Sequence, residues 1–172
     1  MKESKKSIES IYNYYFNDIY RFLLSLSRNH HTAEDIVQET FLRAFLHVGT
    51  HKGGSIKSWL FTVAHNAFID HYRKQKRLEL RENNFFTRLF DIGKTPEETL
   101  IIDEDIQEVI NQLEDLPENQ KYAVLLHDFH DLSYSEAALV MNVSLANFKV
   151  ILFRGRQAIR RKKENEKHER SV

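Results

Sequence analysis

Apolar residues recur at steps of three and four along most of this chain, which is the spacing of α-helices that bury one face. The pattern predicts a first helix over residues 7–28, a second that runs to about His47, and a third that begins after Ser55. Thr32 and Asp35 match a capping box, in which side chains satisfy free N–H groups at a helix start. We therefore expect three helices in the N-terminal half, the second of them begun by Thr32.

The helical pattern resumes in the second half, after a less regular stretch. Residues 78–94 are expected to form a flexible linker, although residues 85–92 are unusually apolar for one. Those residues fit a binding surface for a regulator and fit packing on the chain's own domains equally well. A further helix is predicted to start at 95–98, with Pro at its first helical position, and to end at Leu116-Pro117. Another is expected over 118–130.

Residues 133–161 predict two helices joined by a tight turn. Ser133 and Glu136 match a capping box for the first helix, and Asn142 can adopt the left-handed conformation that ends a helix. Ser144 offers an N-cap for the second helix. This is the layout of a helix-turn-helix, whose second helix enters the DNA major groove. A basic surface helix in an ordinary bundle is the alternative that the pattern alone leaves open.

Composition and charge narrow the class of protein. The 172 residues are 41% apolar and 29% charged, with five Gly, two Pro and no Cys, which favours a helical protein in a reducing compartment. No apolar run reaches the ~20 residues of a membrane helix, and the N-terminus lacks a signal-peptide core, so we expect a cytoplasmic protein. The net charge is zero, yet acids gather at 95–118, whereas 71–77 and the helix after Ser144 are basic. Such segregation permits DNA contact, because local fields govern it.

No enzyme signature is present in the sequence. Walker loops, GxGxxG and HExxH motifs are all absent, so no catalytic residue and no cofactor are predicted. His127 and His130 lie three apart beside Asp131 and have metal-ligand spacing. Because the sequence supplies no clear further ligand, we interpret them as ordinary surface or core histidines and predict no metal site.

The third predicted helix combines aromatic residues with a basic end. Trp59 lies near its start, and four Lys or Arg follow within 71–77. Aromatic rings that stack on bases and cations that meet phosphates suit single-stranded DNA. The alternative for Trp59 and Phe68 is a place in the core, which is the commoner fate of any single aromatic residue.

Five blocks of sequence, in this order, resemble the extracytoplasmic-function sigma factors of bacteria. They are AEDIVQETFLRAF at 33–45, WLFTVAHNAFIDHYRK at 59–74, TPEE at 95–98, LPENQ at 116–120 and LSYSEAALVMNVSLANFKVILFRGRQ at 132–157. The resemblance covers nearly the whole chain. It implies an all-α fold of two helical domains joined by a flexible linker, the second being a helix-turn-helix domain. The implied boundaries are 1–77 for sigma region 2, 78–94 for the linker, 95–165 for region 4 and 166–172 for a charged tail.

The resemblance also implies a function and its residues. Such proteins bind core RNA polymerase, direct it to promoter DNA and help to open the duplex. The surface that would dock on the clamp helices of the largest polymerase subunit comprises Glu34, Asp35, Gln38, Glu39 and Leu42. The residues that would contact the −10 element are Trp59, His65, Asn66, Arg73 and Lys74. Those that would contact the −35 element are Ser144, Asn147, Lys149, Val150, Phe153 and Arg154.

Several positions depart from the family pattern. Val150 stands where Ser is frequent, Asn147 where Thr is common and Gly155 where Ala is usual, so the −35 sequence that is read is open. His65 replaces a common Arg in the −10 region. A partner of the anti-sigma class, often anchored in the membrane, and a role in extracytoplasmic stress are further implications. The alternative function is that of a stand-alone helix-turn-helix repressor or activator, which would use its N-terminal half for a ligand or a dimer interface.

Overall fold

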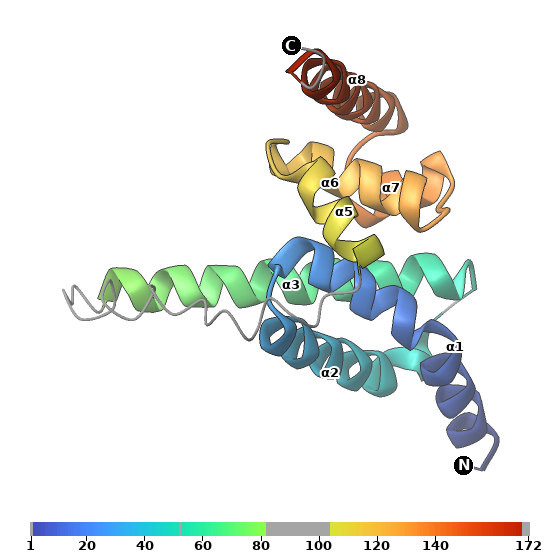
Figure 1. Cartoon of the computed structure of the whole chain (residues 1–172). Helices are drawn as coiled ribbons and strands as arrows, with labels where there is room; N and C mark the ends of the chain where they lie inside the picture. The colour runs from blue at the N-terminus through green and yellow to red at the C-terminus, as the bar shows by residue number, and fades with distance from the viewer. Residues whose placement is uncertain (1, 52, 82–103, 170–172) are drawn as a thin grey trace.

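The computed structural model describes residues 2–51, 53–81 and 104–169 (Figure 1). Within these ranges every regular element is helical. The N-terminal elements are α1 (Lys2–Ser27), α2 (His30–His47), the 3₁₀ turn η1 (Val48–Thr50) and α3 (Ile56–Arg81). The C-terminal elements are α5 (Glu104–Leu113), α6 (Glu118–Val124), the π-helical turn η3 (Leu125–Phe129), α7 (Tyr134–Val140) and α8 (Leu145–Glu169). The prediction of an all-α fold with a C-terminal helix-turn-helix is confirmed.

The N-terminal domain is a three-helix bundle of α1, α2 and α3, each of which contacts the other two. Its core contains Phe22 and Leu23 of α1, Ile36 of α2 and Leu60 of α3, all at most 2% exposed. Burial of each such side chain contributes ~1.5–3 kcal/mol, so this bundle needs no partner to hold α3 in place. The position of α3 matters, because that helix carries the predicted −10 residues.

The predicted start of the second helix is wrong. Asn29, not Thr32, is the N-cap of α2, and its side-chain oxygen accepts a hydrogen bond from the Thr32 backbone N–H at 2.9 Å. Arg28 adopts a φ of 57° and ends α1, so the Asn-His-His stretch holds both a cap and the first turn of α2. Asn caps helices as well as Thr does, which left the sequence signal ambiguous.

Two other expectations meet the edges of the described ranges. The third helix continues to Arg81, past the predicted domain end at residue 77. The predicted helix start at 95–98 and the apolar segment 85–92 lie outside the described residues. Helix α5 is described from Glu104 and ends at Leu113, after which the Leu116 N–H bonds back to the Leu113 carbonyl.

The C-terminal domain packs on the N-terminal one. Helix α5 contacts α1, and α7 contacts α3, so that α5, α6 and α7 lie between α3 and α8 (Figure 1). Buried residues of both domains belong to a single apolar cluster. In the part of the chain that the structure describes, no single helix is long and apolar enough to span a membrane, and the pair α7 and α8 meets that length and composition test only when joined across a 96° bend.

Candidate nucleic-acid interface

The helix-turn-helix is built by local hydrogen bonds that the sequence predicts. The Ser133 N–H donates to Glu136 at 2.9 Å, and the Glu136 N–H donates to the Ser133 hydroxyl at 3.2 Å, which completes the capping box of α7. The bond from the Ser133 N–H also holds the pKa of the Glu136 carboxyl below its usual value. Asn142 takes a φ of 53° after α7, and the Ser144 hydroxyl accepts from the Asn147 N–H at 3.2 Å. These bonds fix the angle at which α8 leaves the turn.

Helix α8 has one buried face and one open face. The buried face consists of Phe148, Ile151, Leu152 and Gly155. On the open side, Val150 is 46% exposed and Phe153 is 60% exposed. Lys149 and Arg154 are exposed beside them. Apolar groups left in water between two cations suit a major groove, where cations bond to guanine and apolar groups meet the thymine methyl.

Ser144 and Asn147 are exposed at the start of the same helix. All six residues predicted for the −35 element therefore lie on accessible parts of one helix and its cap. Ser144 also has a structural role, since its hydroxyl caps α8.

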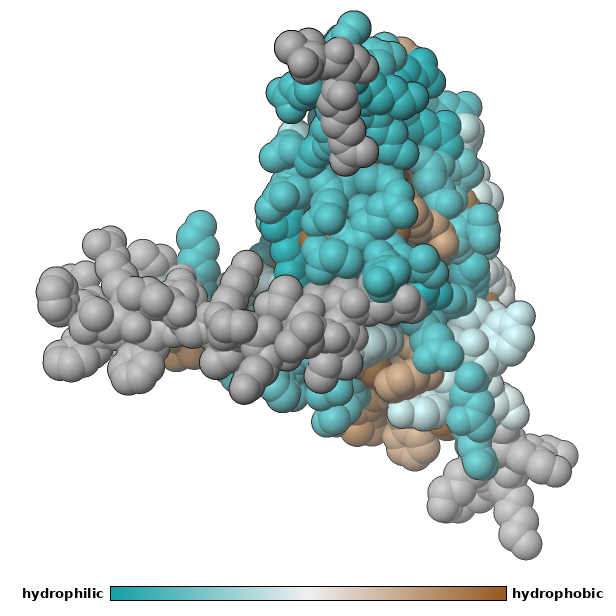
Figure 2. All heavy atoms as spheres, in the orientation of Figure 1, coloured by the Kyte–Doolittle hydropathy of each residue, from teal (hydrophilic) through white to brown (hydrophobic). Residues whose placement is uncertain are grey.

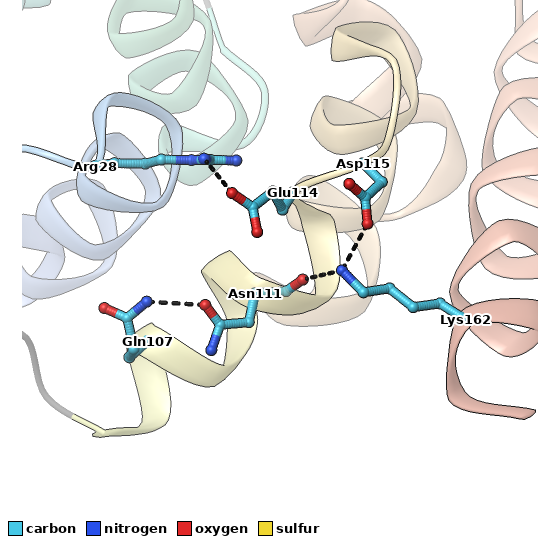
Figure 3. A network of polar contacts seen from close by, with 6 residues as sticks. All are labelled: Arg28, Gln107, Asn111, Glu114, Asp115 and Lys162. Atoms are coloured by element: carbon cyan, nitrogen blue, oxygen red, sulfur yellow. Dashed lines mark hydrogen bonds and ion pairs between the residues drawn. The ribbon is translucent and has the colours of Figure 1, made fainter. Parts of the chain in front are cut away.

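The basic residues of α8 divide into two groups. Arg156 bonds through two nitrogens to the Asp128 carboxylate, and Lys162 bonds to Asp115 at 2.7 Å and to the Asn111 carbonyl at 2.8 Å (Figure 3). The cations of α8 that form no ion pair with a described residue are Lys149, Arg154, Arg160, Arg161 and Lys163. Helix α8 therefore offers DNA fewer cations than its sequence indicates, because Arg156 and Lys162 bond to acidic residues of their own domain.

Tyr134 is a neighbour of the open face that the sequence analysis did not single out. Its ring lies 6.0 Å from the Lys149 ammonium and 4.5 Å from the centre of the His127 ring. A cation over an aromatic face is attracted by about 0.5–1 kcal/mol at an exposed site, so Tyr134 biases the direction of Lys149. The only sequence signal for it was an aromatic residue at the first position after an N-cap.

Four of the five predicted −10 residues share one side of α3, because Trp59, Asn66 and Arg73 are seven residues apart and Lys74 adjoins Arg73. Asn66, Arg73 and Lys74 are exposed to solvent. Trp59 is half-buried, with its ring 4.9 Å from that of His51. The loop before α3 holds Gly53 and Gly54 at φ values of 78° and 97°, conformations that favour glycine.

His65 is placed differently from the other −10 residues. Its ring lies 4.7 Å from that of Tyr122 in α6, and both ring nitrogens are buried without a hydrogen-bond partner among the described residues. Burial lowers the pKa of His65, so the ring is neutral at pH 7. In this arrangement His65 faces the C-terminal domain and not solvent.

The predicted polymerase-binding residues share one exposed face of α2. The members of that face are Glu34, Asp35, Gln38, Glu39 and Leu42. Arg43 donates to Glu39 at 2.6 Å and to Asp70 of α3 at 2.8 Å, which ties this face to α3. Leu42 is 55% exposed, as expected for a contact residue.

Two further apolar residues extend that face beyond the prediction. Phe45 is 49% and Leu46 is 65% exposed, three and four positions after Leu42. Their spacing from Leu42 on one helix was the signal that could have found them. Figure 2 shows apolar surface on the lower side of the molecule, where α1 and α2 lie in Figure 1, whereas the surface at the top around α8 is hydrophilic.

The paired histidines do not form a metal centre. His127 bonds through Nδ1 to the Leu132 carbonyl at 2.7 Å, while the His130 ring packs between Phe22 and Phe61. Across residues 2–51, 53–81 and 104–169, no group of three His, Cys, Asp or Glu side chains is arranged to hold a metal ion.

Comparisons with known proteins cover both domains. The family model for sigma-70 region 2 matches residues 11–78, and that for sigma-70 region 4 matches residues 106–159. The ECF RNA polymerase sigma factor SigM of Bacillus subtilis is 41% identical over 90% of this chain and 93% of its own length. RNA polymerase sigma factor YlaC of the same organism is 28% identical over 98% of each chain.

One solved structure with a similar fold is the sigma factor RpoE of Bartonella quintana, described as a complex with the anti-sigma factor NepR. It superposes with a TM-score of 0.72 at 26% identity and covers 94% of this chain and 96% of its own.

Proposed function

The chain belongs to the extracytoplasmic-function family of RNA polymerase sigma factors, and from that premise we propose which of its surfaces contact promoter DNA and which contact core polymerase. As a sigma factor it directs RNA polymerase to specific promoters for transcription initiation and is not an enzyme. The α8 face that carries Lys149, Val150, Phe153 and Arg154 reads the −35 element in the major groove. The loop before α3 and the residues Trp59, His65, Asn66, Arg73 and Lys74 engage the −10 element as single strands. The observation that carries this division is the open face of α8, where apolar groups are exposed between cations that form no ion pair with a described residue.

The α2 face around Leu42 docks on the clamp helices of the largest polymerase subunit in this proposal. Its exposed acids and leucine lie on the outer side of a helix whose opposite side is buried in the bundle. A stand-alone repressor or activator is disfavoured, because region 2 and region 4 match in the order and spacing of sigma factors. Such a repressor would also have no use for this docking face.

The test adds purified protein to core polymerase and maps new transcription start sites. Leu42→Arg places a charge and extra bulk on the docking face but leaves the buried side of α2 untouched. We expect this variant to keep the helical circular dichroism of the wild type and to lose co-purification with core polymerase. Leu78→Arg makes the same change at a leucine of similar exposure on α3, 49% against 55%, and serves as the control. If the two variants co-purify with core polymerase equally well, the docking site does not lie on α2.

A protein regulator of the anti-sigma class is the second partner that we propose. It would act in the cytoplasm, anchored at the membrane, and release the protein in an extracytoplasmic stress response. Support comes from RpoE of Bartonella quintana, a sigma factor of similar fold whose structure is that of a complex with the anti-sigma factor NepR. The apolar segment 85–92, predicted as its binding surface, lies outside the described residues. Hydrogen exchange over 82–94, past the end of α3 at Arg81, should be fast in the free protein and slow with the product of the adjacent gene; slow exchange in the free protein would contradict this proposal.

A further inference from the structure

Asp70 is an acidic residue in the middle of a basic segment. It is the only Asp or Glu between Glu39 and Glu79 in the sequence, and four Lys or Arg follow it within 71–77. Its side chain is 54% exposed. Because like charges repel, an exposed carboxylate at this place weakens the binding of DNA phosphates unless another charge offsets it.

Asp70 shares one side of α3 with residues that we propose to contact the −10 element. It follows Asn66 by four positions and precedes Arg73 and Lys74 by three and four, and such spacings place side chains on one face of a helix. All four residues are exposed. A DNA strand that meets both Asn66 and Arg73 therefore passes within about one helical turn of the Asp70 carboxylate.

Arg43 of the neighbouring helix α2 bonds to this carboxylate. Helices α2 and α3 pack against each other (Figure 1). The Nη1 group of Arg43 donates to Oδ2 of Asp70 at 2.8 Å, and its Nε group donates to Oε1 of Glu39 at 2.6 Å. The hydrogen bonds to Asp70 and Glu39 raise the pKa of the Arg43 guanidinium. A full positive charge therefore lies beside Asp70.

The Arg43 guanidinium lies between two surfaces of the N-terminal domain. Glu39 belongs to the proposed docking face of α2, whereas Asp70 belongs to the proposed −10 side of α3. An arginine can bond to both acids at once because its donors form a planar fork, which lysine lacks. The Arg43 side chain is 35% exposed, and partly buried charges are screened by salt less than fully exposed ones.

We propose that Arg43 is a positioning residue for promoter binding: it offsets the charge of Asp70 and holds that carboxylate toward α2, beside the path of the −10 strand. This role rests on the proposed function, because it takes the strand to run along this side of α3. The bundle itself does not depend on the pair, since exposed ion pairs contribute little to stability and Ile36 and Leu60 already bury both helices.

The two partners have opposite predicted effects on DNA binding. Arg43→Gln leaves Asp70 as an uncompensated negative charge, so binding should weaken. Asp70→Asn removes that charge and leaves the cation of Arg43, so binding should be as tight as in the wild type or tighter. A pair that only joined α2 to α3 would be broken equally by either substitution and would give losses of the same sign.

Binding of the assembled polymerase complex to a fork-junction DNA tests this role. The probe is a fluorescent duplex whose single-stranded arm carries the −10 element of a start site mapped with the wild type. Arg43→Gln should bind it about fivefold more weakly, the effect of one unit charge about 4 Å away in water. The slope of log K against log salt should become shallower by about 0.7, because one fewer phosphate is effectively neutralised on a single strand. Adding Asp70→Asn to Arg43→Gln should restore both quantities toward the wild-type values.

Arg28→Gln is the matched control. It breaks the Arg28–Glu114 ion pair, whose side chains are 32% and 56% exposed, against 35% and 54% for Arg43 and Asp70. Because that pair does not involve α3, Arg28→Gln should leave fork binding unchanged. Arg43→Lys keeps a cation beside Asp70 and should retain most of the binding. Circular dichroism and co-purification with core polymerase check that each variant is folded and assembled before binding is measured.

Two results would overturn the role of Arg43. One is wild-type affinity and salt slope for Arg43→Gln. The other is a loss of binding in both Arg43→Gln and Asp70→Asn that the double substitution does not restore, since that pattern indicates a structural pair or a direct contact of Arg43.

Arg73→Ala separates these results from a failure of the proposed function. It removes a cation from the same side of α3 and should weaken fork binding. If Arg73→Ala weakens binding and Arg43→Gln does not, only the role of Arg43 is wrong. If Arg73→Ala changes neither the affinity nor the salt slope, the −10 strand does not run along this side of α3, and the proposed −10 surface and the role of Arg43 are both wrong.

Discussion

The two long helices that we propose to contact DNA, α3 and α8, are of nearly equal length but differ in what covers them. Helix α8 buries Phe148, Ile151 and Leu152 against its own domain and leaves the opposite side open. Helix α3 is covered on one side by α1 and α2 and on another by α7 and the Tyr122 ring of α6. Helix α8 thus presents one open side to solvent, whereas α3 is covered on two sides.

This difference separates two kinds of DNA surface. The open face of α8 needs only the local caps and turn that orient it, so it exists whether or not polymerase is present. The proposed −10 surface of α3 is partly covered by the chain's own C-terminal domain, because the His65 ring packs against that of Tyr122. On the proposed assignment, the surface for reading duplex DNA is open in this structure, whereas the side of α3 that carries His65 is covered by the C-terminal domain.

The largest predicted effect is the difference in stability between substitutions at two adjacent residues of α8, one on its buried side and one on its open side. Leu152 is 2% exposed and Phe153 is 60% exposed. Leu152→Ala should lower the free energy of unfolding by about 2–5 kcal/mol, as large-to-small core changes do. Phe153→Ala should change it by less than about 0.5 kcal/mol and still reduce transcription from a −35-dependent promoter. Urea unfolding followed by circular dichroism, with transcription on the same samples, measures both, and similar unfolding curves would refute the two-faced helix.

A second prediction divides the arginines of α8 by their partners. Arg154 has no ion-pair partner in the described chain, so Arg154→Ala should remove about 1–3 kcal/mol of discrimination at one −35 position. Arg161→Ala should weaken binding evenly across sequences and reduce its salt dependence. Arg156→Ala should instead destabilise the domain, because Arg156 bonds to Asp128, whose hydrogen bond raises the pKa of the guanidinium. Binding of the polymerase complex to a panel of −35 variants distinguishes the three substitutions. If Arg154→Ala and Arg161→Ala give the same binding profile, Arg154 does not read a base and the proposed reading face is wrong.

Local features of both helices were predictable from sequence, because a cap depends on residues three apart. The Ser133 box, the left-handed Asn142 and the caps Ser144 and Ser55 were all found. The cap of α2 was mistaken where Asn29 and Thr32 competed, since both side chains can accept the same kind of bond.

The contacts between distant segments were not predictable. His130 meets Phe61 across more than sixty residues, and no periodicity within either helix records that pairing. For the same reason, the basic sequence of α8 could not predict that Arg156 and Lys162 bond to acidic residues far away in the chain. The residues expected at the −10 and −35 elements and the domain boundaries stay predictions.

A smaller effect is expected from the caps that start the two helices. The Ser55 hydroxyl accepts from the Ser58 N–H at 3.1 Å, and the Ser144 hydroxyl accepts from the Asn147 N–H at 3.2 Å. Ser55→Ala and Ser144→Ala should each cost about 1 kcal/mol of stability. Only Ser144→Ala should also alter transcription in a way that depends on the −35 sequence. The measurement is unfolding in urea beside transcription from −35 variants, and an unchanged unfolding midpoint for both would show that water replaces the caps.

The smallest net change is expected at Gly155, where two opposing effects meet on the buried side of α8. Alanine stabilises a helix interior by up to about 1 kcal/mol relative to glycine, and sequence alone therefore indicates a gain. A Cβ at this position would lie 3.0 Å from the Val124 side chain and 3.4 Å from Gln120. Val124 is 1% exposed and packed on every side, so it yields only at a cost similar to the gain. Gly155→Ala should thus shift stability by less than about 0.5 kcal/mol.

The balance at Gly155 is exposed by a second substitution. In the Val124→Ala background the contact is relieved, and Gly155→Ala should then stabilise the domain by about 1 kcal/mol, which appears as coupling in a double-mutant cycle. Additive effects of the two substitutions would mean that α8 moves away from α6 to admit the methyl group. In that case α8 can shift relative to α6 although its inner side is buried, whereas α3 is held by neighbours on two sides.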